Sequence, residues 1–336
     1  MASLRTYIIA RLLMVLPMIL ILLSFVFLVL HVLPGDPVSA MLGPKAPEEQ
    51  KELMRRQLGL DKHPIFQYAD YIVRLSKGDF GTSILMRRPV LVELLERFPA
   101  TLELTITSMI IAILIGVLAG AHSAYKQGSA FDHGYRFYAI VLWSMPIFWL
   151  GMLFQLFFGV YLGWLPMFHR DSPLMAPQTI TGLHVLDSIL SGNLPALSDS
   201  VAHLVLPSVT LGTVLSGIFV RLTRANMVDT LRQDYIAAAR ARGLPERAVV
   251  LRHALKNSFI PVLTMMGLQF ALMLGGAALT ERTFSWPGVA TYLIERIYYR
   301  DFPAIQGAIV FYAILVVMVS TIVDIVYAYI DPRIRY

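Results

Sequence analysis

The chain has 336 residues, of which 57% are apolar and only 15% are charged, and it carries a net charge of +6 without a single cysteine. Soluble domains are about half apolar and a quarter charged, so this composition disfavours a soluble globular domain, a disordered chain and a fibrous protein. The lack of cysteine excludes a disulfide framework, an iron–sulfur cluster, a cysteine nucleophile and a thiolate zinc site.

Six stretches are long and apolar enough to cross a bilayer, which takes roughly 20 residues in a helix. None of them contains Lys, Arg, Asp or Glu. The first is longer than the apolar part of a secretory signal, so we expect it to be retained. The sequence therefore predicts an all-α membrane protein with six transmembrane helices. They are Leu12–Leu33, Leu104–Ala121, Phe137–Leu162, Val201–Val220, Ser258–Leu279 and Phe302–Val323.

Lysine and arginine near the span ends predict the orientation, because they collect in cytoplasmic segments. Placing four basic segments in the cytoplasm predicts that both termini are cytoplasmic and that 34–103 is a large first external loop. This loop is basic too, with ten Lys and Arg, but at about 70 residues it is long enough that its charge affects the topology weakly. Basic cytoplasmic loops also account for the net charge, so we expect membrane lipid and no nucleic acid as a partner. The basic residues are Arg5 and Arg11, Lys126 and Arg136, eight residues from Arg221 to Lys256, and Arg333 and Arg335.

The first external loop contains two amphipathic segments that predict short helices. Glu48–Leu60 ends with Gly59 at a C-cap position, and Phe66–Leu75 places its apolar residues largely on one side. We interpret both as an interfacial scaffold rather than as a ligand contact. The segment 163–200 is rich in Pro, Gly and Ser and is expected to be irregular.

Motifs for catalysis and cofactor binding are missing from the sequence. There is no Gly-Lys dipeptide and hence no P-loop, no HExxH and no close histidine pair, so we expect neither a metal site nor a catalytic residue. Glu103 and Asp324 lie at predicted span ends, where solvation at the interface explains them. The small residues Gly116 and Gly120 predict close packing with another helix.

The predicted spans offer only a weakly polar path for a substrate. Ser144, Ser216 and Gln269 are the candidate residues of this path, and no convergent charged pocket accompanies them. We therefore expect that no single side chain in the spans determines which substrate is accepted.

The loop between the fourth and fifth spans has the strongest pattern. Met227–Arg242 reads as one helix with an apolar face that includes Tyr235 and Ala238/Ala239, Gly243 stops it, and Pro245 starts a second helix, Glu246–Leu255. We call residues 227–255 the elbow. Two interpretations remain open: a basic helix lying on anionic lipid, or a docking element for a cytosolic partner.

The elbow resembles the "EAA" coupling loop of binding-protein-dependent ABC importer permeases. The run from Asp234 to Gly243, followed by His253-Ala-Leu-Lys-Asn257 and Pro261, is similar to the dipeptide, oligopeptide and nickel branch. Ala237 stands where the general motif has glutamate, as is common in that branch. The resemblance extends over nearly the whole chain, to the B-type subunit. It includes Pro34-Gly-Asp-Pro37, Leu58–Asp61, Gln67-Tyr68, Gly78–Ser83, Phe98–Leu104, Ser144–Trp149, Phe284–Gly288 and Asp331-Pro-Arg333.

The resemblance implies a permease subunit of the bacterial cytoplasmic (inner) membrane. It would pair with a homologous C-type subunit, receive substrate from an external substrate-binding protein, and be driven by two cytosolic ABC ATPase subunits. The chain itself would be no enzyme and would bind no cofactor, since the partner ATPases use ATP and Mg. The implied residues for coupling to the ATPases are Asp234, Tyr235, Ala238, Ala239, Arg240, Arg242, Gly243 and Leu244.

The same resemblance divides the chain into three parts: a tail and first helix (1–33), the external scaffold segment (34–103), and a core permease domain (104–336) with five transmembrane helices and the coupling loop 221–257. The implied substrate is a dipeptide or short peptide. Nickel-chelate or haem import by the same architecture is an alternative. A secondary carrier fits less well, because no buried ion-binding carboxylate and no inverted repeat are evident.

Overall fold

The computed structural model describes all residues except 1–3, 33–36, 44, 60 and 331–336. The described residues are helical apart from connecting segments and one isolated β-bridge between Thr82 and Pro89. Two motifs used above, Pro34–Asp36 and Asp331–Arg333, lie outside them. The helices are α1 Leu4–Val32, α2 Pro37–Leu42, α3 Glu48–Leu58, α4 Pro64–Ser76, α5 Val90–Tyr125, α6 Ala130–Ser144, α7 Ile147–Phe154, η1 Gln155–Tyr161, α8 His184–Leu190, α9 Leu194–Leu231, α10 Asp234–Ala241, α11 Glu246–Ala248, η2 Val249–Leu255, α12 Lys256–Gly276, α13 Ala278–Thr283, α14 Val289–Tyr298 and α15 Phe302–Ile330.

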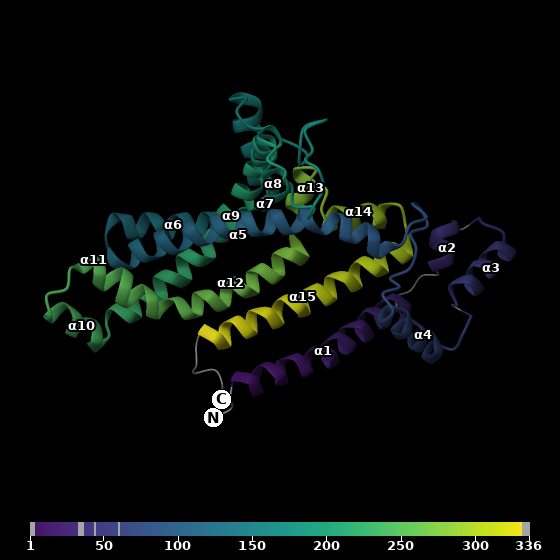
Figure 1. Ribbon diagram of the computed structural model, residues 1–336, viewed down its shortest axis with the longest axis horizontal. Helices are drawn as coiled ribbons and strands as arrows, with labels where there is room; N and C mark the ends of the chain where they lie inside the picture. Colours follow the sequence, from purple (N-terminus) through teal and green to yellow (C-terminus); the bar gives the residue numbers. More distant parts are fainter. Residues whose placement is uncertain (1–3, 33–36, 44, 60, 331–336) are drawn as a thin grey trace.

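Two long helices, α5 with 36 residues and α9 with 38, form the axis of the molecule. In Figure 1, α12, α15 and α1 follow beside them, and α10 and α11 occupy one end, which we call the elbow end. The opposite end, called the far end, holds α2, α3, α4 and α14. The start of α1 and the end of α15 point toward the elbow end. The arrangement thus separates the elbow from the scaffold by the whole length of the bundle.

Close contact between α5 and α9 depends on glycine. A Cβ atom at Gly116 would lie 2.3 Å from Cβ of Phe219, and one at Gly120 would lie 2.7 Å from Cβ of Thr223. Neither distance is possible for a real side chain, so only glycine lets the two backbones approach this closely. The packing role predicted for the Gly116–Gly120 pair is confirmed.

The largest apolar cluster continues this contact toward α12 and the α13–α14 turn. Leu104 of α5, Phe219 of α9, Val262 of α12 and Trp286 of the turn are fully or almost fully buried in it. Burial of such side chains supplies the main packing energy between these helices, at roughly 1.5–3 kcal/mol for each large apolar residue.

Within the described residues, five single helices are long and apolar enough to cross a membrane, and a sixth crossing would require a bent pair. The span predicted over 137–162 is a bent pair of helices, because α6 and α7 meet at an angle of 103°. Met145 is extended at the break, with φ −81° and ψ 131°, and Pro146 follows it. Proline disfavours a helical residue before it and lacks the N–H that a continuous helix needs.

The two short helices predicted in the 34–103 segment are confirmed as α3 and α4, and Gly59 has the expected left-handed conformation with φ 68°. The segment 163–200 is only partly irregular, because it contains α8 and the start of α9; this part of the expectation is wrong. The boundary placed at 103/104 falls inside α5, so the scaffold and the core share one continuous helix.

We predict that Gly116→Val destabilises the α5–α9 contact by about 1–3 kcal/mol or more, because the new side chain overlaps Phe219. Gly134→Val is the matched control, since this glycine of α6 has open space around it. The measurement is the thermal unfolding midpoint of the purified protein in detergent. Equal midpoints for the two variants would contradict the packing.

Candidate functional site

The elbow contains a break that the sequence did not indicate. The helix expected over Met227–Arg242 is wrong: α9 ends at Leu231, Gln233 is extended with φ −75° and ψ 149°, and α10 starts at Asp234. An acidic residue in the first turn of a helix is favoured by the helix dipole, which supports a separate start at Asp234. The break lets α10 turn back onto the bundle.

The break also changes which face of α10 is buried. Ile236 is fully buried and Ala239 is 8% exposed, whereas Tyr235 and Ala238 face outward. The prediction that Tyr235 and Ala238 lie on the buried apolar face is therefore wrong. Because α10 starts anew after the break, its side chains do not point in the directions that a continuous helix from α9 would give them. We call the buried cluster beneath α10 the elbow core. It consists of Ala121 and Ala124 of α5, Met227 of α9, Ile236 and Ala239 of α10, and Val249, Val250 and Ala254 of η2.

Gly243 ends α10 in the way expected. Its φ is 76°, its N–H donates to the Arg240 carbonyl at 2.9 Å, and the Leu244 N–H donates to the Ala239 carbonyl at 3.4 Å. This pair of bonds is the Schellman pattern, which requires a left-handed residue at its centre. The prediction of a glycine stop is confirmed, and Pro245 follows as the N-cap of α11.

Two side-chain contacts hold the elbow in shape. The Arg240 guanidinium binds the Glu246 carboxylate through two nitrogens, at 2.8 and 3.2 Å, across the turn at Gly243. Asn257 donates its amide to the Tyr235 hydroxyl at 2.9 Å and so ties α10 to α12. The elbow is therefore a braced unit before any partner binds.

The implied coupling residues divide into two groups. Ala239 is inside the elbow core and Gly243 shapes the turn, so both act within this chain. Asp234, Ala238 and Arg242 are exposed on α10 and its C-cap, and Leu244 beyond the turn is 39% exposed. Only the second group, with the outer faces of Tyr235 and Arg240, is available for contact with another protein.

A buried ion pair lies just behind the elbow. Arg224 of α9 donates two hydrogen bonds to Asp132 of α6, at 2.6 and 2.8 Å. Asp132 also accepts from the Ser123 hydroxyl of α5 and from the N–H of Gly128. Three helices are thus held at one carboxylate. Sequence reasoning missed it, because the only local signal is the acidic residue in the first turn of α6.

The elbow runs without interruption into a long helix. The second helix expected over Glu246–Leu255 is present as α11 and η2, and it continues directly as α12. The η2 segment has wide π-type turns, which are frequent at functional sites. The chain therefore connects α10 to α12 through a segment with less regular hydrogen bonding than an α-helix.

The three candidate residues of the substrate path are not brought together. Ser216 is buried between α9 and α6, where its hydroxyl lies 2.8 Å from the Tyr138 hydroxyl. Ser144 is exposed at the end of α6 and donates to the Ile140 carbonyl. Gln269 is half-buried on α12, with its amide 3.7 Å from the sulfur of Met265.

Buried charges also lie in the half of α5 that is nearer the far end. They fasten two segments to α5, 163–193 and the α13–α14 turn, which we call the far-end segments. Glu103 was expected to be solvated at an interface; this is wrong, because it is buried and accepts two hydrogen bonds from Arg170, at 2.6 and 3.0 Å. Its other oxygen accepts from the N–H of Val185. Asp324, by contrast, is partly exposed and pairs with Arg11 at 3.1 Å. Glu103 therefore fastens the 163–193 segment to α5.

A second buried carboxylate, Glu281, fastens the α13–α14 turn to the same part of α5. It accepts from the Thr101 hydroxyl at 2.7 Å and from the Thr291 N–H at 2.8 Å. It also lies directly beneath Gly288, where a Cβ atom would be 2.1 Å from the carboxylate. Burial raises the pKa of Glu281 to about 7.

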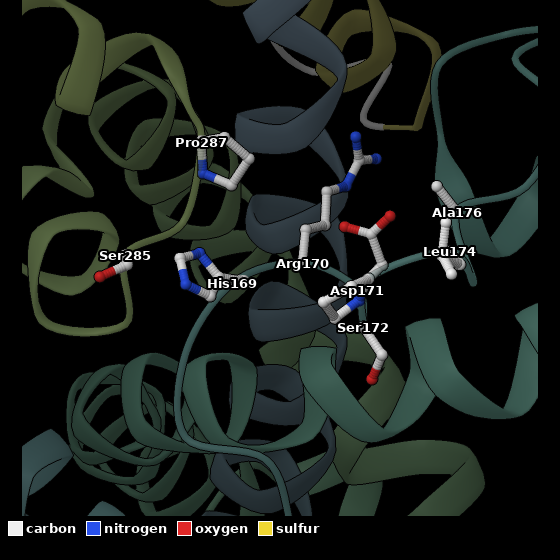
Figure 2. A pocket seen from close by; sticks show the side chains of 9 residues that line it. His169, Arg170, Asp171, Ser172, Leu174, Ala176, Ser285 and Pro287 are labelled. Carbon is white, nitrogen blue, oxygen red and sulfur yellow. The ribbon is translucent and has the colours of Figure 1, made fainter.

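Between these two fastened segments lies a pocket of about 300 Å³. In Figure 2, His169 and Ser285 lie on one side and Leu174 and Ala176 on the other, with Arg170 and Asp171 between them. His169, Leu174 and Ser285 have positive φ angles of 64°, 70° and 49°, which are strained for residues other than glycine. The described residues contain no group of three or more His, Cys, Asp or Glu side chains suited to a metal ion.

An all-helical core with several apolar helices, a braced elbow at one end and a scaffold at the other defines a multi-pass membrane protein. Residues 112–336 match the family of binding-protein-dependent transport system inner membrane components, and residues 4–105 match the N-terminal part described for the same systems. The chain belongs to this family, which confirms the resemblance seen in the sequence, and it is a component of the inner membrane.

Relatives resemble the chain over almost its full length. It is 44% identical to the dipeptide transport system permease protein DppB of Alkalihalophilus pseudofirmus, over 98% of this chain and 99% of the relative. It is 39% identical to DppB of Escherichia coli K12, over 98% of both chains. It is 41% identical to the glutathione transport system permease protein GsiC of Salmonella typhimurium, over 98% of this chain and 99% of the relative.

We predict that Gly243→Val opens the elbow. The site has open space, so the cost comes only from the backbone: a left-handed conformation costs an L-residue roughly 1–2 kcal/mol. Trypsin cleavage after Arg240, Arg242 and Arg247, followed by mass spectrometry, should become faster. Gly243→Asn is the control, because asparagine tolerates this conformation. Identical cleavage rates in all three proteins would show that the turn does not depend on glycine.

We predict that Glu281 makes stability fall as pH rises. Its pKa is raised in the folded protein, so its contribution is fully present below the ordinary value of 4.5 and is lost as pH rises to about 7. Glu281→Gln mimics the protonated acid. Its unfolding midpoint should match the wild type at pH 5 and exceed it at pH 8. Glu49→Gln, at an exposed position of α3, is the control. A pH-independent difference between Glu281→Gln and wild type would refute the assignment.

Proposed function

We propose that this chain is the permease subunit of an ATP-driven importer that translocates dipeptides across the cytoplasmic membrane. One observation carries the proposal: the identity of 44% to a dipeptide permease extends over 98% of the chain, scaffold and elbow included. Reconstitution with its partner subunits and measurement of ATP-dependent dipeptide uptake tests it. Absence of uptake in the complete system would contradict it.

In this proposal the elbow end is cytoplasmic, as are both termini, and α2, α3 and α4 are external. Basic residues support this orientation, because α10 and the adjoining turns contain Arg232, Arg240, Arg242 and Arg247. The bent pair α6–α7–η1 counts as the third of six crossings. The far-end pocket between the two fastened segments would then face the side from which substrate arrives.

The elbow is proposed to receive one of two cytosolic ABC ATPases. Its exposed residues, Asp234, Ala238, Arg242 and Leu244, supply the contact, while the elbow core transmits displacement to α5, α9 and η2. The pair of Asp132 and Arg224 makes α6 move with α5 and α9. ATP and Mg would be used in the ATPases, and this chain would bind no cofactor.

The remaining partners follow from the same proposal. A homologous C-type permease subunit would cover the exposed apolar side chains of α6, α7 and η1, which include Phe137, Trp149 and Phe157. An external substrate-binding protein would deliver the peptide at the far end. The rigid attachment of both far-end segments to α5, through Glu103 and Glu281, suits a surface that must dock repeatedly.

A short peptide larger than a dipeptide is the second candidate substrate. The observation that favours it is the identity of 41% to a glutathione permease over the same length of chain. Competition between a labelled dipeptide and unlabelled glutathione in the reconstituted system separates the two. Competition by glutathione at concentrations similar to those of dipeptides would favour the second candidate.

We predict that Ala238→Arg uncouples the chain from its ATPase. Ala238 is exposed, so the new side chain leaves the elbow core intact but places bulk and charge in the contact. Uptake and ATPase recovery on co-purification should fall by about tenfold or more, which corresponds to a loss of about 1.4 kcal/mol or more in binding free energy. Ala239→Arg gives a less specific result, because it disrupts the elbow core itself.

Gly134→Arg is the control for this prediction, since it adds the same charge at an open position of α6 near the elbow end. A helix that merely rests on anionic lipid would tolerate or gain from an added arginine. Normal uptake together with normal ATPase recovery in Ala238→Arg would therefore eliminate the docking role of α10.

A further inference from the structure

One exposed arginine of α9, Arg221, has an aromatic partner and no acidic one among the described residues. The guanidinium of Arg221 in α9 lies over the ring of Trp143 in α6, 5.1 Å from the ring centre. Both side chains are exposed, Trp143 to 56%. Among the described residues, no carboxylate lies within ion-pair distance of Arg221. Arg224, the next arginine along the same helix, does have an acidic partner, because it binds Asp132 through two nitrogens.

The guanidinium of Arg221 points toward the middle of the bundle. Arg224 meets Asp132 in the first turn of α6, whereas Trp143 lies eleven residues further along that helix, about 16 Å away at 1.5 Å per residue. Arg221 therefore extends away from the elbow end to reach the ring. Figure 1 shows that α6 lies beside the elbow-end half of α5 and that α7 turns away near the middle. The guanidinium is directed toward this bend.

This direction argues against a contact with lipid headgroups. An arginine near a membrane surface extends toward the surface, because a charge in the hydrocarbon interior is costly. Charged residues that point inward face a water-filled cavity and mark the path of a substrate. Ser144, one of the three residues expected on the path, is the neighbour of Trp143 and is exposed on the same stretch of α6. The position of Arg221 therefore fits a wet path along α6 and α9.

We propose that Arg221, held over Trp143, binds the C-terminal carboxylate of a peptide during its passage. The inference rests on the proposed function and adds a contact to it. The Arg221 guanidinium, which lies over the Trp143 ring, forms no ion pair with a described carboxylate, so its N–H groups can make a bidentate bond to the carboxylate of a peptide. Every peptide carries this carboxylate whatever its side chains, so one arginine serves a path that does not select among side chains.

The cysteine-free chain permits a direct test. Arg221→Cys is reconstituted with cysteine-free partner subunits, and uptake of a labelled dipeptide is measured before and after modification. Aminoethyl methanethiosulfonate adds a positive charge at the thiol, and sulfonatoethyl methanethiosulfonate adds a negative one. Arg136→Cys is the matched control, because Arg136 is an exposed arginine of α6 without the stacking contact. ATP hydrolysis and complex recovery are recorded throughout.

We expect Arg221→Cys to reduce uptake by about tenfold, as for loss of one charge-assisted hydrogen-bonded contact. The aminoethyl reagent should restore most of the uptake, the sulfonatoethyl reagent should not, and neither should affect Arg136→Cys or the wild type. Complex recovery should stay unchanged, since the Arg221 side chain contacts Trp143 of its own chain. A residue with a merely structural role would not respond to the sign of the added charge.

Several results would overturn the assignment. Unchanged uptake in Arg221→Cys, or equal effects of the two reagents, would exclude a carboxylate contact. A loss confined to vesicles that contain anionic lipid would assign Arg221 to headgroups, and reduced recovery of the complex would assign it to the other permease subunit. Absence of dipeptide uptake with the wild-type chain would overturn the proposed function and this contact together, which distinguishes it from failure of the contact alone.

Discussion

The contact between the backbones of α5 and α9 is the constraint on which both ends of the molecule depend. Gly116 and Gly120 bring the two longest helices within reach of each other, and the large apolar cluster forms around them. At one end α5 contributes Ala121, Ser123 and Ala124 to the elbow core and to the buried ion pair. At the other end it contributes Thr101 and Glu103 to the far-end segments. One helix therefore carries both attachments.

This arrangement explains how a signal at the elbow can reach the far end. Helix α5 has 36 residues and is about 54 Å long, and Pro99 is the single proline inside it. In the proposed function, displacement of α10 would act on α5 and α9 through the elbow core, and the pair of Asp132 and Arg224 would include α6 in the same movement. At the far end, Glu103 and Glu281 fasten two separate segments to α5. These segments must follow α5 whenever it tilts.

Local backbone requirements were predictable from the sequence, whereas pairing across long separations was not. Gly59 and Gly243 were recognised as helix ends because positive φ favours glycine wherever the chain folds back. The buried pairs of Glu103 with Arg170 and Asp132 with Arg224 join residues 67 and 92 positions apart, and no local pattern marks them. The phase of α10 was missed for another reason: a break of two residues shifts every later side chain around the helix. The elbow was thus located correctly, but its exposed face was not.

The bracing of the elbow has a thermodynamic consequence for assembly. Binding normally costs conformational entropy for each loop and side chain that becomes ordered at the interface. Here the Schellman turn, the contact of Arg240 with Glu246 and the burial of Ile236 have already fixed α10 within its own chain. The ATPase proposed to dock on α10 would therefore lose little of its binding free energy to ordering this chain.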